Sequence, residues 1–236
     1  MRYRFLLFDV DNTLLDFDAN EAESFRSMMQ EVGEVWTQEI YETYRRMNIN
    51  LWKMIERKEI TLEEGINRRF SDLMAFYGKR VNGQKWEMIY RSYLNQGIQK
   101  IPQVDFVLQN LKKQGYKLYV ITNGVEETQV SRMEKSGLGQ YFENSFISGK
   151  VGAEKPSKEF FDYVKSHIEG FEERTALVIG DSLTSDIKGG VDGGIDTCWF
   201  CREKKKGVWK EELKESGLQP DYVIGELTEL LEILSV

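Results

Sequence analysis

Short apolar runs, separated by segments with helical spacing, restrict the fold of this chain more than any other feature. Runs rich in β-branched and aromatic residues lie at Tyr3–Phe8, Lys117–Ile121, Asn144–Ile147, Thr175–Ile179 and Asp196–Phe200. Between the later runs, Gln103–Gln114 and Ser157–Ile168 carry apolar residues at helical spacing. Parallel strands need crossover connections, and helices provide them. The alternation predicts an α/β fold with a doubly wound, mostly parallel sheet and helices on both faces.

The stretch from residue 18 to residue 96 breaks this alternation. It contains no convincing strand, and it is rich in Met, Trp, Tyr, Arg and Glu. Thr61 and Glu64 have the spacing of a helix capping box. A segment of this length is too long for a loop. We therefore predict an all-helical domain, 18–96, inserted into an α/β core domain made of 1–17 and 97–236.

Composition narrows the class of protein. Apolar residues make up 41% of the 236 and charged residues 30%, which is typical of a soluble globular chain. The net charge of −7 argues against a nucleic acid polymer as partner, and the one basic cluster, Arg202 to Lys206, is expected to be a solvated loop. No stretch approaches the length of a membrane span. A cytoplasmic protein is expected, as a monomer or homodimer.

Polar, chemically capable residues follow four of the predicted strands. In a doubly wound sheet, ligands bind beyond the carboxyl ends of the strands. The residues found there are Asp9 and Asp11, then Thr122 and Asn123, then Lys155, and finally Asp181 with Asp186. Because parallel strands end at the same edge, we expect these side chains to meet around one pocket.

Each of these residues also has a purely structural interpretation. Acids at a strand end are usually solvated, and Thr122 or Asn123 alone would be a cap for the helix at Glu126–Lys135. Lys155 before a proline would be a surface lysine. Asp181, Ser182 and Asp186 could cap the helix expected at 185–190. These interpretations do not explain why an acid pair, a threonine, a lysine and a second acid pair follow one another along one edge.

In this order the residues resemble the four motifs of the haloacid dehalogenase-like (HAD) hydrolases. "DVDNT" at 9–13 is similar to motif I, Thr122 to motif II, Lys155 to motif III, and "GDSLTSD" at 180–186 to motif IV. The resemblance spans nearly the whole chain and implies a Rossmann-like core, with the helical insertion as a cap that closes over substrate. "DVDNTLLDF", "ITNG" and "VGAEKPSKEFFDY" resemble bacterial pyrimidine 5′-nucleotidases of the YjjG type.

Electrostatics points to a metal. A carboxylate nucleophile must approach a doubly charged phosphate ester, and two like charges 4 Å apart cost about 4 kcal/mol at an effective dielectric near 20. Asp9, Asp181, Asp186 and the phosphate sum to about −5, and Lys155 adds about +1. A divalent cation makes the balance tolerable. Hard oxygen ligands, with no histidine or thiol nearby, favour Mg²⁺ over zinc.

The resemblance also implies a role for each residue. Asp9 would be the nucleophile that forms an aspartyl-phosphate, and Asp11 the general acid and then base. Thr122, Asn123 and Lys155 would bind the phosphoryl oxygens. Asp9, the Asp11 carbonyl and Asp181 would hold Mg²⁺, with Asp186 supporting a metal-bound water or Lys155.

Three functions remain open from the sequence. The first is a 5′-nucleotidase acting on (deoxy)pyrimidine nucleoside monophosphates. The second is a phosphatase for another small metabolite, such as phosphoglycolate or a sugar phosphate. The third is a non-catalytic regulator that binds metal or phosphate. Asp11 favours phosphoryl transfer over dehalogenation, since dehalogenases have no acid two residues after the nucleophile. The complete set of motif residues argues against the regulator.

Overall fold

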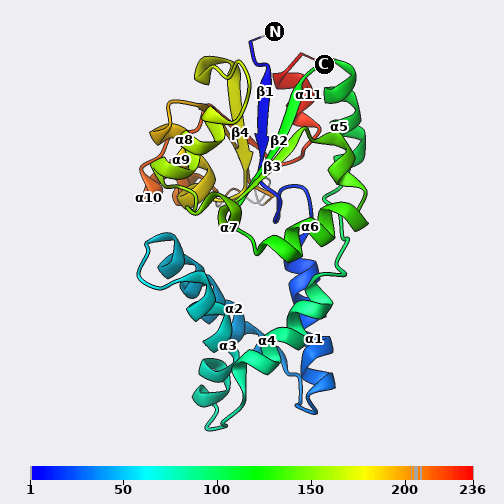
Figure 1. Cartoon of the computed structure of the whole chain (residues 1–236), viewed down its shortest axis with the longest axis vertical. Helices are drawn as coiled ribbons and strands as arrows, with labels where there is room; N and C mark the ends of the chain where they lie inside the picture. The colour runs from blue at the N-terminus through cyan, green and yellow to red at the C-terminus, as the bar shows by residue number, and fades with distance from the viewer. Residues whose placement is uncertain (1, 203, 205–206, 208, 236) are drawn as a thin grey trace. The chain divides into compact units, whose positions relative to one another are not determined.

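The structure, a computed structural model, describes residues 2–202, 204, 207 and 209–235. The chain forms two compact units (Figure 1). Met1–Phe17 together with Ile98–Val236 make up the core unit, and Asp18–Gly97 make up the helical unit. In the expected basic loop at 202–206, Arg202 pairs with Asp16 and Lys204 with Glu229, at 2.9 and 2.6 Å. Residues 203, 205 and 206 of that loop lie outside the described residues.

The core unit is built on one six-stranded sheet. Its strands are β1 (Phe5–Phe8), β2 (Lys117–Thr122), β3 (Asn144–Ile147), β4 (Ala176–Gly180), β5 (Asp196–Phe200) and β6 (Tyr222–Ile224). They lie in the order β3-β2-β1-β4-β5-β6. Each neighbouring pair of strands is parallel. The predicted parallel α/β sheet is confirmed. The sixth strand, β6, was not predicted, because no apolar run in the sequence indicated it.

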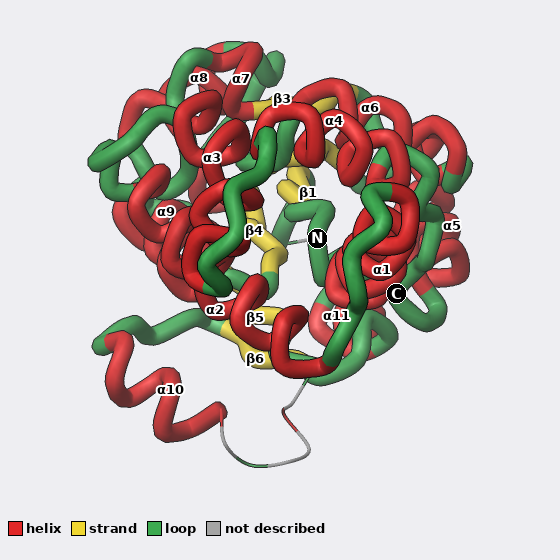
Figure 2. The backbone as a smooth tube through the Cα atoms, turned by 90° about the horizontal axis from the view of Figure 1, so that it is seen from below, coloured by secondary structure: helices red, strands yellow, loops and turns green. Residues whose placement is uncertain are grey.

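Side chains alternate along the central strand β1 and enter two apolar cores. Leu6 and Phe8 pack in a core shared with α5 (Val104–Lys113) and α11 (Glu229–Ile233). Phe5 and Leu7 pack in a second core with α8 (Lys158–Ser166). Figure 2 shows α8 on one side of the strands and α5 and α11 on the other. Burial on both faces explains why β1 is apolar at every position rather than at alternate ones.

The described part of the core unit contains further helices and turns. They are α6 (Glu126–Lys135), α7 (Ser148–Val151), α9 (Lys188–Asp192), α10 (Trp209–Ser216) and the 3₁₀ turns η1 (Leu138–Tyr141) and η2 (Glu173–Thr175). The helix expected at 185–190 is divided into a π-helical turn, η3 (Leu183–Ile187), and α9. The division arises because the N–H groups of Asp186 and Ile187 both donate to the carbonyl of Ser182. Such π turns are frequent at functional sites.

The inserted segment is all helical. It contains α1 (Phe17–Glu31), α2 (Gln38–Glu56), α3 (Leu62–Phe76) and α4 (Gly83–Leu94). Thr61 and Glu64 form the predicted capping box at the start of α3. The aromatic rings of Phe25, Tyr44 and Phe70 stack in its core, with Tyr44 4.6 Å from Phe25 and 5.6 Å from Phe70 between centroids.

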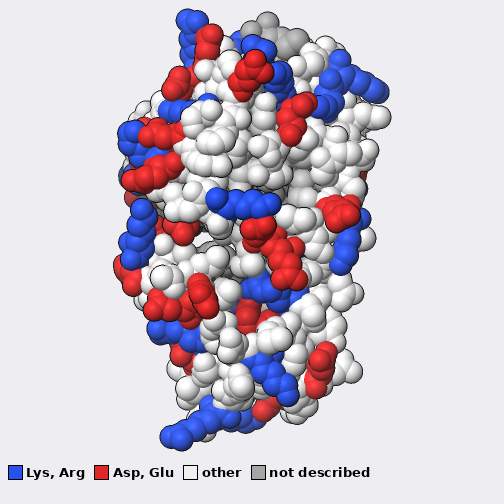
Figure 3. All heavy atoms as spheres, in the orientation of Figure 1, with Lys and Arg blue, Asp and Glu red and all other residues white. Residues whose placement is uncertain are grey.

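Charges of both signs are interspersed on the face of the molecule shown in Figure 3. The described residues include exposed pairs one helical turn apart, such as Arg68 with Asp72 and Lys188 with Asp192. Pairs of this kind stabilise a surface helix only slightly. Among the described residues, every helix falls short of the length and apolar character that crossing a membrane requires.

Candidate active site

The predicted site residues lie at or after the carboxyl ends of four neighbouring strands, at one edge of the sheet. Asp9 follows β1, and Thr122 ends β2. Asp181 follows β4, and Lys155 lies in the loop between α7 and α8, after β3. Because β3, β2, β1 and β4 are consecutive in the sheet, segments more than 100 residues apart in sequence meet at the carboxyl ends of these strands.

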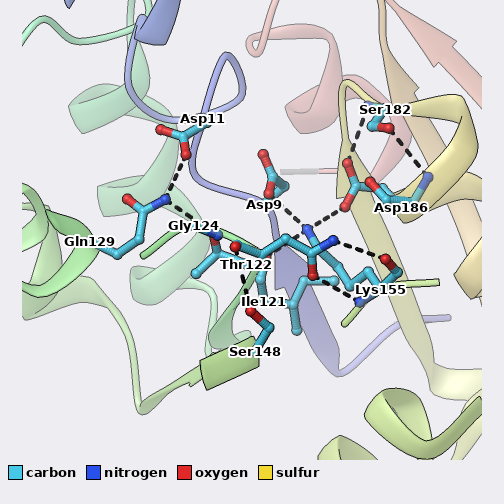
Figure 4. Close-up of polar contacts among 12 residues, drawn as sticks. Asp9, Asp11, Ile121, Thr122, Gly124, Gln129, Ser148, Lys155, Ser182 and Asp186 are labelled. Carbon is cyan, nitrogen blue, oxygen red and sulfur yellow. Dashed lines mark hydrogen bonds and ion pairs between the residues drawn. The ribbon is translucent and has the colours of Figure 1, made fainter. Parts of the chain in front are cut away.

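Lys155 lies at the centre of this group (Figure 4). Its ammonium donates to Oδ1 of Asp9 at 2.8 Å, to Oδ1 of Asp186 at 2.6 Å and to the carbonyl of Ile121 at 3.0 Å. The Lys155 side chain is only 1% exposed. The interpretation of Lys155 as a surface lysine is therefore wrong. A buried ammonium with three acceptors is a fixed positive charge in a site of little water.

Three carboxylates surround this single lysine. Oxygen atoms of Asp9, Asp181 and Asp186 all lie within 4.8 Å of one another. Burial, together with the neighbouring carboxylates of Asp186 and Asp11, raises the pKa of Asp9 to about 7, although Lys155 acts in the opposite direction. Desolvation and the charges of Asp9 and Asp186 raise the pKa of Asp181 well above its ordinary value. The cluster therefore has more negative charge than Lys155 alone can balance.

The same environment favours the charged form of Lys155, whereas it disfavours the charged forms of Asp9 and Asp181. Burial disfavours its charge, but Asp186 and Asp9 outweigh burial and raise the pKa of Lys155. The lysine is thus protonated throughout the physiological range. It can stabilise negative charge but cannot act as a proton acceptor there.

Local backbone features fix the two acids that follow β4. The Ser182 N–H donates to Oδ2 of Asp186 at 3.1 Å, which leaves Oδ1 facing Lys155. A Cβ at Gly180 would meet Oδ2 of Asp186 at 2.2 Å, so the closeness of that carboxylate requires glycine. The indole of Trp199 on β5 donates to the Asp181 carbonyl at 2.8 Å. The structural interpretation holds in part, because Ser182 does cap η3.

Asp11 lies beside α6 instead of in the lysine cluster. Its Oδ2 accepts from Nε2 of Gln129 at 2.5 Å, and its Oδ1 pairs with Arg132. Figure 4 shows Asp11 turned toward Gln129, while Asp9 faces Lys155. Asp9 and Asp11, which are two residues apart in sequence, therefore have different partners, and their carboxylates point to different parts of the site.

Thr122 and Asn123 do not cap α6, whose N-cap is Val125. The Thr122 hydroxyl accepts from the Gly124 N–H at 3.0 Å and from Gln129 at 3.1 Å. Both polar atoms of the Asn123 side chain bond to the backbone of Lys155, each at 2.8 Å. Asn123 thereby holds the loop that carries Lys155, so a phosphate contact from Asn123 would come from its backbone N–H.

Comparison with known proteins identifies the family of this chain. A family model described as haloacid dehalogenase-like hydrolase matches residues 6–200. The chain belongs to the haloacid dehalogenase-like hydrolases. The family assignment made from the motifs is thus confirmed.

Three bacterial relatives match this HAD-like hydrolase along almost its whole length. The HAD-hydrolase YfnB of Bacillus subtilis is 40% identical over 235 residues, which cover 100% of this chain and 97% of YfnB. The pyrimidine 5′-nucleotidase PynA of Streptococcus pneumoniae is 37% identical, over 99% of this chain and 96% of PynA. The pyrimidine 5′-nucleotidase YjjG of Escherichia coli is 27% identical, over 99% of both.

A solved structure of YfnB is also similar. That crystal structure was determined with bound magnesium and was described as revealing interdomain movement. It superposes on this HAD-like hydrolase with a TM-score of 0.92 and covers 100% of both chains.

The residues of the cluster fit a magnesium ion. All the side-chain ligands they offer are carboxylate oxygens, which Mg²⁺ prefers. The raised pKa values of Asp9 and Asp181 show that these acids are destabilised as anions unless further positive charge is supplied. A divalent cation next to Asp9 and Asp181 would supply it, and Asp186 would remain with Lys155.

Three residues of the site were absent from the sequence prediction. Gln129 and Arg132 bond to Asp11, and Trp199 holds the backbone of Asp181. Gln129 and Arg132 lie three residues apart on α6, so they share one helix face. That spacing was the only available signal, and without the path of the chain nothing connected it to Asp11.

Proposed function

We propose that this HAD-like hydrolase is a Mg²⁺-dependent phosphatase that acts on (deoxy)pyrimidine nucleoside 5′-monophosphates. The observation that carries the chemistry is the buried ammonium of Lys155 held between Asp9 and Asp186. It places a fixed cation beside the candidate nucleophile, where a phosphoryl group would arrive. The choice of substrate class is supported by the names of two relatives, PynA and YjjG.

The reaction has two steps. In the first, an Asp9 oxygen attacks phosphorus, and the bond from phosphorus to the ester oxygen breaks with its electron pair going to that oxygen. Asp11 donates the proton that makes it an alcohol. In the second, water attacks the aspartyl-phosphate, Asp11 takes the water proton, and the bond to Asp9 breaks to release phosphate. The same phosphoryl group is transferred in both steps, and it lies next to the Lys155 ammonium in each.

Two groups would hold the phosphoryl oxygens in both steps. The Lys155 ammonium supplies positive charge, and the Thr122 hydroxyl supplies a donor at the end of β2. Mg²⁺, when bound by Asp9, Asp181 and the Asp11 carbonyl, would offset the repulsion between the ester and the carboxylates. Because the site residues are fixed by hydrogen bonds before substrate arrives, little reorganisation is needed.

A substrate panel tests the proposal directly. Initial rates with dUMP, dTMP and dCMP are compared with those on phosphoglycolate and sugar phosphates, with Mg²⁺ and with excess chelator. We expect kcat/KM to be at least about tenfold higher for the pyrimidine nucleotides, and activity to be lost with chelator. Preference for a sugar phosphate would establish the second function. Absence of hydrolysis of every ester would leave only the regulator.

The nucleophile is tested by Asp9→Asn. The substitution is nearly isosteric, so the protein should fold, but the amide cannot form the aspartyl-phosphate. We expect kcat to fall by roughly 10⁴-fold or more. Asp192→Asn, which alters an exposed carboxylate on α9, should retain wild-type kcat. Wild-type turnover by Asp9→Asn would contradict the covalent mechanism.

Metal binding is tested separately from catalysis. A ligand that binds only the folded state stabilises it by about 2.7 kcal/mol at a hundred times its Kd. Mg²⁺ should therefore raise the Tm of the wild-type protein, and Asp181→Asn should abolish most of that rise because it removes a carboxylate ligand. The same Tm rise in Asp181→Asn would show that Mg²⁺ binds elsewhere. Asp192→Asn is again the control that keeps the effect.

A further inference from the structure

The Asp11 carboxylate is held by two side chains from one face of α6. Gln129 donates to Oδ2 at 2.5 Å, and Arg132 forms an ion pair with Oδ1. Each carboxylate oxygen thus has its own donor, and rotation of the carboxyl group would break both contacts. The Asp11 side chain is 28% exposed, so an acid that water could otherwise reorient is fixed by protein.

Both donors are themselves held in place. Gln129 and Arg132 are 2% and 1% exposed. The guanidinium of Arg132 donates to the Gln129 amide oxygen at 3.4 Å and lies 5.5 Å from the centre of the Phe17 ring. Burying a guanidinium is costly unless its charge is paired, and Asp11 is a carboxylate that pairs with it. The arrangement is therefore rigid enough to fix the direction of a proton transfer.

Gln129 also connects Asp11 to the candidate phosphate site. Its Nε2 nitrogen donates to the Asp11 carboxylate and to the Thr122 hydroxyl, the latter at 3.1 Å. One amide group thus sets the distance between the proposed acid and a proposed phosphate ligand. Such coupling is what a general acid requires, because its proton must reach the oxygen that leaves that phosphate.

We propose that Gln129 and Arg132 are positioning residues that orient Asp11 for proton transfer to the leaving oxygen. The inference rests on the proposed function, in which Asp11 is the acid and base. Neither residue is required to touch the substrate. Their removal should therefore impair only the part of catalysis that Asp11 provides, and should leave nucleophilic attack by Asp9 intact.

Leaving groups of different basicity test this distinction. A nucleoside 5′-phosphate releases an alkoxide and depends on protonation, whereas p-nitrophenyl phosphate releases a stable phenolate. The comparison uses kcat/KM, which reports the steps up to departure of the leaving group and so excludes the later hydrolysis of the aspartyl-phosphate. We expect Arg132→Met to lower kcat/KM on dUMP by about 10- to 100-fold. On p-nitrophenyl phosphate the loss of kcat/KM should be below about threefold. Equal losses on both esters would show a merely structural role and overturn the inference.

Two further variants guard against misfolding of Arg132→Met. Arg132→Lys keeps the charge and should recover part of the activity on dUMP. Gly124→Ala adds a Cβ that would meet Nε2 of Gln129 at 1.9 Å, so it displaces that amide from both Asp11 and Thr122. An effect through Thr122 cancels in the ratio of kcat/KM on p-nitrophenyl phosphate to kcat/KM on dUMP, and this ratio should rise as it does in Arg132→Met. Glu134→Gln, at an exposed position of α6, is the matched control and should behave as wild type on both esters.

A double-mutant cycle separates the positioning role of Arg132 from the acid role of Asp11. Asp11→Asn should itself show the ester-dependent loss, and adding Arg132→Met to it should cause no further loss, because the positioned group is already gone. An additional loss on dUMP in the Asp11→Asn background would overturn the inference while leaving the proposed function standing. If Asp11→Asn lost kcat/KM equally on both esters, the acid role within the proposed function would be wrong instead.

Discussion

At the scale of single residues, Lys155 shows how a charge is kept inside this protein. Its ammonium is buried, and three oxygen acceptors surround it. The desolvation of such a group is offset only while its partners are charged and in place. Removing either partner would leave the other as an uncompensated buried charge, so the lysine and its carboxylates are energetically coupled.

This coupling is measurable by chemical denaturation in excess chelator. Lys155→Met leaves buried carboxylates without their cation, and we expect the free energy of unfolding to fall by about 3–5 kcal/mol. Adding Asp186→Asn removes one of those carboxylates and should restore part of the loss. Lys158→Met, which breaks an exposed pair with Asp162, should change the free energy by less than about 0.5 kcal/mol. A double variant no more stable than Lys155→Met would contradict the coupling.

At the scale of elements, a buried polar network joins all four helices of the helical unit. The carboxylate of Glu21 on α1 accepts from Asn48 on α2 at 2.9 Å, and Asn48 accepts from Arg69 on α3 at 3.2 Å. Arg69 pairs with Glu87 on α4 at 2.6 Å. The Tyr44 hydroxyl adds a further donor to Glu21, at 3.3 Å. Such a network favours one register of the helices over others.

The network makes the stability of the helical unit depend on pH. Burial raises the pKa of Glu21 from 4.5 to about 7, even though Arg69 and Arg45 oppose the shift. Between these values the folded state holds a proton that the unfolded state has released. The free energy of unfolding therefore falls as pH rises from about 4.5 to about 7, by at most on the order of 3 kcal/mol.

Glu21→Gln removes this titration while keeping an acceptor oxygen. We expect the drop in Tm between pH 5 and pH 8 to be smaller in Glu21→Gln than in the wild type, because the amide binds no proton in that range. Thermal unfolding followed by circular dichroism at the two pH values gives the comparison. Glu63→Gln, at an exposed position of α3, should retain the wild-type drop. Identical drops in all three proteins would show that Glu21 does not titrate in this window.

At the scale of the whole molecule, the strand order decides which segments can form a site. β1 is paired with β2 on one side and β4 on the other. The three segments that end in Asp9, Thr122 and Asp181 are therefore neighbours, although the helical unit is inserted between the first and the second. An insertion of this kind is tolerated when its ends lie close together. Asn20, near its start, donates to the carbonyl of Leu94, near its end, at 3.1 Å.

We propose that the helical unit is a separate domain, and this is testable with fragments. Residues 18–97 contain their own aromatic core and polar network, so this fragment should show a helical circular dichroism spectrum and a cooperative thermal transition. The fragment 98–236 lacks β1, the strand between β2 and β4, and should not fold. A disordered 18–97 fragment would show that the helical unit depends on the rest of the chain.

The sequence by itself determined the parallel α/β core, the helical insertion and the order of the motifs. These follow from local patterns: a strand buried on both faces is apolar at every position, and a helix repeats its apolar residues every three or four. β6 escaped prediction because three residues, Tyr222–Ile224, are too few to form such a pattern.

Only the tertiary structure decided how the polar groups of the site pair with one another. It placed Lys155 in the interior rather than at the surface, and it put Gln129 and Arg132 against Asp11, 118 and 121 residues away. It also gave Asn123 the Lys155 backbone as its partner. Hydrogen bonds and ion pairs act over a few ångströms in any direction, so their partners depend on the path of the chain, which no local pattern of residues records.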